Sequence, residues 1–160
     1  MPNSSQVQGL LDQLSKEISG GHNGIEGFID DLQMFVTKRD DVSPTGLEEK
    51  LNAANRGDQI QSAQERKELF SKMLMKFQHY PSAQKLFAFF LARINDVFEN
   101  HIEPHAPYLK RQEVDEIIDE KIINPSIQEM GVGFEHFVIN HAHVRGMIYW
   151  LADRCHVRWC

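Results

Sequence analysis

The chain has 160 residues, of which 41% are hydrophobic and 25% are charged, values typical of a globular domain and not of a disordered segment. Its net charge of −6 disfavours direct contact with nucleic acid or with an anionic membrane surface. The polar N-terminus lacks a signal-peptide pattern, and the longest apolar run, residues 86–92, is far too short to span a bilayer. We therefore expect a cytoplasmic protein that makes no use of a membrane.

Apolar side chains in the first part of the chain recur every three or four residues, which is the spacing of an amphipathic helix. One such stripe runs over residues 7–18, and a second start signal followed by a new stripe predicts another helix over residues 25–36. Residues 40–46 are rich in Asp, Pro and Gly and predict a loop. This loop is the only seam that the composition suggests in an otherwise single domain over residues 1–160.

Three more helices are predicted in the middle of the chain. A short one over residues 47–54 precedes a longer one, which starts near Asp58 and ends at Tyr80 and Pro81. The next helix, over residues 83–100, is apolar on most faces, so we expect it at the centre of the fold.

Proline and aromatic residues divide the last third of the chain. Two prolines predict a loop over residues 101–107. An apolar stripe over residues 114–122 predicts a helix that ends before Pro125, because the position before a proline disfavours helical backbone. Residues 133–140 are aromatic and β-branched, which suits a strand or an extended arm better than a helix. Residues 156–159 alternate between apolar and polar, so they suit a short strand.

Between those two segments, Asn140 can cap a final helix with Val144, Met147 and Leu151 on one face. Together the patterns predict a mainly α fold. We expect a compact domain of about six to seven helices. The patterns also allow a short β element near the C-terminus.

Cysteine and histidine gather in the final quarter and raise the question of a zinc site. Cys155 and Cys160 have four residues between them and no second pair, whereas structural zinc sites usually use closer pairs. The imidazoles of His136, His141 and His143 are available, so zinc binding by these side chains stays an open question. The spacing favours reduced thiols and capping or surface imidazoles, and we assign no metal ligand and no cofactor to this chain.

Catalytic motifs are scarce. The chain has no G-x-S-x-G, no H-E-x-x-H, no Walker glycine loop and no Rossmann fingerprint. Cys155 and His156 are sequence neighbours, whereas a catalytic Cys–His pair meets across a fold. We therefore name no catalytic residue and expect no hydrolysis of DNA, RNA or peptide. A small metal-dependent nuclease, or another enzyme that uses the His- and Cys-rich C-terminus, is the alternative.

The segment from His141 onward is basic, in contrast to the acidic chain as a whole, and it mixes arginine with aromatic side chains. That mixture is enriched at protein interfaces, but two Trp side chains can equally close the bottom of a helical core. We expect a packed closing layer whose Arg and Trp edges form, or support, a partner interface. The candidate interface residues are Trp150, Arg154, His156, Arg158 and Trp159.

The sequence GMIYWLADRCHVRW at residues 146–159, with QERKELFSKMLMKF and EVDEIIDEKIINP upstream, resembles the C-terminal domain of ABC-three-component systems. These are antiphage operons that pair an effector with an SMC-like ATPase and a small middle component. The resemblance covers about residues 60–160. It implies a helical module that attaches an effector to the ATPase, the middle component or both, while catalysis belongs to a separate domain.

No nuclease or protease domain precedes the module here, so the resemblance leaves open whether the chain is an isolated domain or a stand-alone subunit. A homo-oligomer is compatible with the sequence. A toxin–antitoxin or phage-encoded helical regulator fits the size and composition equally well.

Overall fold

The computed structural model describes residues 2–20, 24–39, 46–131 and 133–159. Every regular element in that part of the chain is a helix, and α-helices alone hold more than half of the 160 residues, which confirms the mainly α fold. In chain order the helices are α1 (Pro2–Ser19), α2 (Asp30–Val36), α3 (Leu47–Ala53), η1 (Gly57–Gln59), α4 (Ile60–Phe77), α5 (Pro81–Val97), η2 (Phe98–Ile102), η3 (Glu103–Tyr108), α6 (Arg111–Ile118), η4 (Asp119–Ile123), α7 (Asn124–Met130) and α8 (His141–Asp153).

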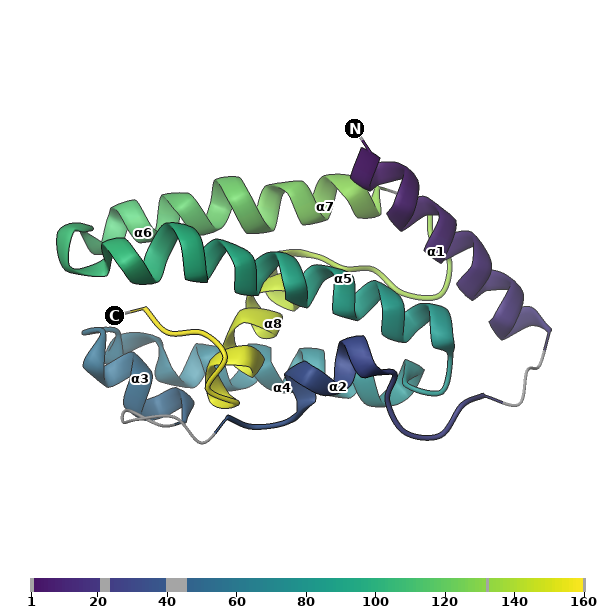
Figure 1. Ribbon diagram of the computed structural model, residues 1–160, viewed down its shortest axis with the longest axis horizontal. Helices are drawn as coiled ribbons and strands as arrows, with labels where there is room; N and C mark the ends of the chain where they lie inside the picture. The colour runs from purple at the N-terminus through teal and green to yellow at the C-terminus, as the bar shows by residue number, and fades with distance from the viewer. Residues whose placement is uncertain (1, 21–23, 40–45, 132, 160) are drawn as a thin grey trace.

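Helix α8 lies inside a stack formed by the other helices (Figure 1). Helix α4 packs along one side of α8, together with α3, while α5 and the long helix formed by α6, η4 and α7 cover the other side. A cluster of buried apolar side chains draws on every α-helix from α1 to α8. The fold therefore has one shared core among its described residues.

Helix α5 occupies the central place that its apolar sequence predicts. Phe87, Phe90, Leu91 and Ile94 are all fully buried. Its first turn is capped from another helix, because Glu17 of α1 accepts hydrogen bonds from the backbone N–H and the hydroxyl of Ser82.

The expected short β element is not found within the described residues. Residues 133–140 form an irregular segment before α8 with a bend at residues 135 and 136, and they belong to no strand; residues 156–159 are also irregular. Phe134 and Phe137 pack on the core in the first of these segments, so their aromatic character serves side-chain packing and not a sheet.

The helix predicted over residues 25–36 is shorter in the structure, because only α2 is helical. The residues before α2 are held in a non-helical bend by Gln84 of α5, whose amide nitrogen donates to Gly27 O at 2.8 Å. Its amide oxygen accepts from Ile29 N at 2.7 Å. Ile25 N donates in turn to His79 O at 2.8 Å. These long-range bonds replace the local bonds that a helix would have used.

The helix predicted to end before Pro125 continues to Met130, so that boundary is wrong. A π turn, η4, precedes the proline, and Asn124 N donates to Asp119 O in the wider spacing of that turn. Pro125 then lies in the first turn of α7, where a missing N–H costs little. The loop predicted over residues 101–107 is also more regular than expected, since most of it forms the 3₁₀ helix η3.

Residues 40–45 of the predicted seam lie outside the residues that the structure describes.

Candidate functional site

The C-terminal segment leaves α8 through a sharp turn that directs it back over the fold. Asn140 caps the start of this helix by accepting from His143 N at 3.2 Å, as its position predicts. At the other end, Cys155 has a positive φ of 64°, while Cys155 N donates to Ala152 O and His156 N donates to Leu151 O. This bonding pattern is a Schellman motif with cysteine in the position usually taken by glycine.

Both Trp side chains of the predicted interface are in the core. Trp150 is 2% exposed and meets the ring of Phe70 edge-on at a centroid distance of 5.6 Å. Trp159 is 5% exposed and packs against Phe98 of η2 and Tyr149 of α8. The aromatic part of the C-terminal segment therefore forms a packed layer between η2 and α8.

Arg154 and His156 connect this layer to the end of α2. The Nε atom of Arg154 donates to Val36 O at 3.2 Å, and its guanidinium carbon lies 4.1 Å from the centre of the Trp150 ring. The Nε2 atom of His156 is 2.8 Å from Thr37 O, and burial lowers the pKa of this imidazole. A neutral imidazole with its proton on Nε2 satisfies that contact, because the carbonyl oxygen can only accept.

Arg158 is half-buried and lies beside Glu103 at the start of η3. Burial raises the pKa of the Glu103 carboxyl group, an effect that the nearby charge of Arg158 opposes. Arg154 and Arg158 are thus the two members of the predicted set that keep a substantial part of their side chains in solvent.

A buried lysine beneath the segment was not anticipated from the sequence. Lys50 of α3 is 1% exposed, and its Nζ donates to Ala152 O at 2.5 Å near the C-terminal end of α8. Burial lowers its pKa, while the neighbouring Cys155 acts in the opposite direction. Leu47 N also donates to Asp153 Oδ1 at 3.2 Å. Two residues of α3 therefore bond to the C-terminal end of α8. A capping role for a lysine 102 positions away in the chain has no local sequence signal.

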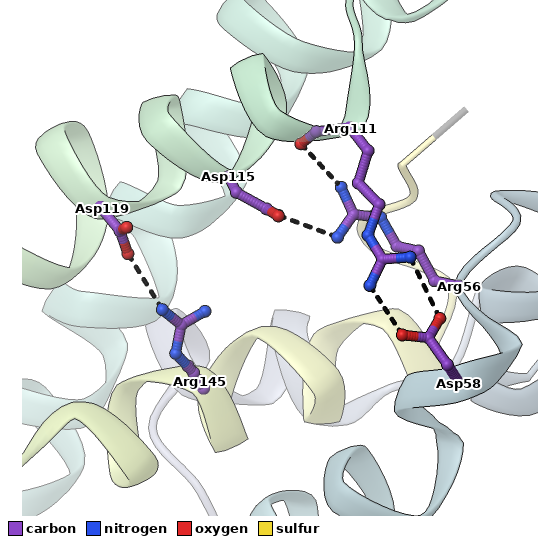
Figure 2. Close-up of polar contacts among 6 residues, drawn as sticks. All are labelled: Arg56, Asp58, Arg111, Asp115, Asp119 and Arg145. Carbon is purple, nitrogen blue, oxygen red and sulfur yellow. Dashed lines mark hydrogen bonds and ion pairs between the residues drawn. The ribbon is translucent and has the colours of Figure 1, made fainter.

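A second polar site is a cleft of about 370 Å³ between α4 and α8 on one wall and α6 and η4 on the other, and Trp159 of the C-terminal segment borders it. Figure 2 shows the ion pairs that cross it. Arg145 Nη2 of α8 is 3.0 Å from Asp119 Oδ1 of η4, and Arg56 Nη1 is 2.8 Å from Asp115 Oδ1 of α6. Sequence reasoning missed this cleft, because its charged residues look like ordinary solvated helix faces when each helix is considered alone.

At one edge of the same cleft, Arg111 of α6 and Asp58 of η1 form a two-bond pair, with N···O distances of 3.1 and 2.9 Å. Arg56 also donates to the backbone oxygen of Arg111 at 3.4 Å. Three guanidinium–carboxylate pairs therefore join the two walls.

No group of three or more His, Cys, Asp or Glu side chains within the described residues lies close enough together to hold a metal ion. Of the zinc candidates, His143 takes part in the cap at Asn140, and His141 is exposed at the helix start. Cys155 is buried beside Lys50, and Cys160 lies outside the described residues. Across the described ranges, the structure also has no helix that combines the length and apolar character needed to cross a bilayer.

A comparison with protein families places residues 46–159 in the family described as C-terminal domain 9 of the ABC-three component (ABC-3C) systems. The matched region begins next to α3 and includes both the C-terminal layer and the two walls of the cleft. Comparisons with curated proteins and with solved structures found no match. Because the family match covers well over half of the chain, this protein belongs to the C-terminal domain 9 family of the ABC-three component systems.

Proposed function

We propose that this chain is a non-catalytic docking domain of a cytoplasmic antiphage defence complex. In this proposal it attaches to the SMC-like ATPase, to the middle component or to both, and so brings an effector into the assembly. The observation that carries the proposal is the family match over residues 46–159, since a C-terminal domain of a three-component system works among the other components.

The surface proposed for docking is the C-terminal layer around Arg154 and Arg158. Both arginines are half-buried, and the guanidinium group of Arg154 lies over the ring of Trp150, which is packed in the core. Arginine on a rigid aromatic base is a frequent centre of binding energy at protein interfaces. Trp150 and Trp159 then support the interface from below, while His156 keeps the segment attached to Thr37.

The side chain of Arg154 is already ordered before any partner binds, and this favours an interface role for it. Its side chain already lies on the Trp150 ring and donates to Val36 O. A partner that engages it therefore loses little side-chain entropy, which is one of the main costs of association. The planar guanidinium group can still offer its remaining N–H groups to a carboxylate of the partner.

The proposal is tested by two variants examined in parallel for stability and for partner capture. Trp159→Ala should lower the free energy of unfolding by about 3 to 5 kcal/mol, because it removes a buried aromatic ring. The double change Arg154→Ala and Arg158→Ala should lower the melting temperature much less than Trp159→Ala, because it leaves the packed aromatic layer in place although it removes the contacts of Arg154 with Val36 O and Trp150. It should also reduce co-purification with the ATPase or the middle component by about tenfold or more.

Lys72→Ala combined with Lys121→Ala is the matched control, since it removes two positive charges from exposed positions on other helices. This control should capture the partners as the wild type does. If the double arginine variant unfolds at low temperature and still captures its partner, both arginines serve the fold and the proposed docking surface is wrong.

A further inference from the structure

The cleft between α4–α8 and α6–η4 carries more hydrogen-bond donors than its own carboxylates use. Its lining includes Arg56, Arg66 and Arg145, together with the hydroxyl groups of Ser62 and Tyr149. The opposing acceptors are the side chains of two aspartates, and each of these is already paired with one arginine across the cleft (Figure 2). The lining therefore favours a ligand that is rich in acceptors.

Among the arginines that line the cleft, Arg66 has no ion pair with a carboxylate of the described residues. It projects from α4, and its guanidinium donates to the hydroxyl of Ser62 one turn earlier on the same helix. It makes no ion pair with any residue that the structure describes. Since a guanidinium group has five N–H donors, most of the hydrogen-bonding capacity of Arg66 remains for a ligand.

Arg145 can add a second contact. Its side chain is one-third exposed, and a single nitrogen is bonded to Asp119. Tyr149 lines the same cleft one helical turn after Arg145, with its ring against Trp159, so its position in the lining is fixed by packing. Two guanidinium groups and a phenol on adjacent helices offer a set of donors that suits the oxygens of a phosphate group.

Apart from Gln59, the remaining lining is apolar, and the volume of the cleft is limited. Ile118, Ile148 and the edge of Trp159 border the same space, which at about 370 Å³ falls in the range of small-molecule sites. We propose that this cleft binds a small organic phosphate, with Arg66 and Arg145 on the phosphate group and the apolar wall against the rest of the molecule.

The two aspartates argue for a small anion over a polymeric one. Asp115 and Asp119 are 42% and 48% exposed and face the same opening, so they repel an extended run of phosphates or carboxylates. The acidic charge of the chain as a whole acts in the same direction. The proposed docking arginines, Arg154 and Arg158, do not line this cleft, although Trp159 borders both sites, so this inference does not rest on the docking role.

The test is calorimetric titration of the full chain with pyrophosphate and with adenosine monophosphate, at an ionic strength held constant with sodium chloride. We expect saturable binding of both probes below about 10 mM. Arg66→Gln should weaken pyrophosphate binding by about tenfold or more, because it removes a charge-assisted contact. Lys72→Gln is the matched control: it removes the same charge from an exposed site on the same helix, outside the cleft, and should leave the affinity unchanged.

Two further variants keep the test decisive even if Arg66→Gln folds poorly. Asp119→Asn should strengthen pyrophosphate binding by about threefold or more, since it removes a repelling charge while keeping the side-chain shape. Tyr149→Phe should weaken binding by several-fold and leave the melting temperature nearly unchanged, because the packed ring is retained.

Three results would overturn the proposal. One is that pyrophosphate, adenosine monophosphate or both fail to show saturable binding. Another is equal binding by Arg66→Gln and Lys72→Gln, which would move the site away from the cleft. The third is tighter binding of a single-stranded oligonucleotide or an acidic peptide than of adenosine monophosphate at the same salt concentration. That result would mean that the ligand of the cleft is a macromolecular anion and not a small phosphate.

Discussion

His156 is held at the contact between the C-terminal segment and α2. Its ring meets Phe35 edge-on at a centroid distance of 5.8 Å, and its Nε2 atom is bonded to Thr37 O. Burial is the largest cause of its lowered pKa, and the nearby positive charges of Arg39 and Lys50 act in the same direction. The folded protein therefore favours the neutral imidazole, whereas the unfolded chain leaves it free to take up a proton.

This difference predicts a loss of stability in mild acid. Because the folded-state pKa of His156 is lowered, its contribution is fully present above the unfolded-state value of about 6.5 and is lost as the pH falls through the folded-state pKa. Urea unfolding between about pH 7.5 and pH 5 should show a falling midpoint. His156→Gln should flatten that fall. His101→Gln, at an exposed position, should follow the wild-type curve.

His143 sets a background for the same measurement, since burial also lowers its pKa and its effect has the same sign. A residual slope in His156→Gln is therefore expected. A slope identical to that of the wild type would show that His156 is as easily protonated in the folded protein as in the unfolded chain.

At the scale of elements, the approach of α8 to α4 depends on Gly146. A Cβ atom built at this position would lie 2.2 Å from Arg66 O and 3.1 Å from Phe70 Cβ. The backbone of α4 occupies that space and cannot move aside as a flexible side chain would. The glycine therefore lets two helices touch closely, at the point where α4 and α8 form one wall of the cleft.

Gly146→Ala should consequently destabilise the protein, even though alanine is the better helix former. Overpacking of this kind typically costs about 1 to 3 kcal/mol. The contrasting variant is Gly9→Ala in α1, where a Cβ would meet nothing within 4 Å. It should raise the free energy of unfolding by about 0.5 to 1 kcal/mol. Thermal melts of the two variants provide the comparison, and a stabilising Gly146→Ala would contradict the close approach.

At the scale of the whole molecule, ion pairs connect the long helix made of α6, η4 and α7 to the segment around η1. These pairs differ in how far their side chains are exposed to solvent. Arg56 is buried, with 4% of its side chain exposed, and it is paired with Asp115. The Arg111–Asp58 pair joins the same two layers but is open to solvent. A buried cation that loses its partner is costly, whereas exposed pairs contribute little to stability.

The two pairs should therefore respond differently to neutralisation of the acid. Asp115→Asn should lower the free energy of unfolding by about 1 to 3 kcal/mol, because it leaves the buried guanidinium of Arg56 without a counter-charge. Asp58→Asn should leave it close to the wild-type value, although hydrogen bonding to Arg111 lowers the pKa of the Asp58 carboxyl group. Urea titrations at low and high salt measure both effects. Equal losses in the two variants would mean that burial does not distinguish these pairs.

Local patterns in the sequence determined much of this protein. The stripes every three or four residues predicted most of the helices, the apolar faces of residues 83–100 predicted a central α5, and Asn140 predicted the start of α8. The residues at 146–159 carried the resemblance that the family match confirmed. Helix spacing, capping and motif order act over a few neighbouring residues, so a sequence records them directly.

Tertiary structure decided which of those residues meet. Gln84 keeps the residues before α2 out of a helix, and the π turn before Pro125 extends a helix that the proline alone would have ended. Arg145 meets Asp119 across 26 positions, and Arg154 meets Val36 across 118. Contacts at such separations depend on how complete helices pack against one another. The packed layer formed by the two tryptophans was expected from the sequence, but the rings that they meet and the existence of the arginine-lined cleft came only from the folded chain.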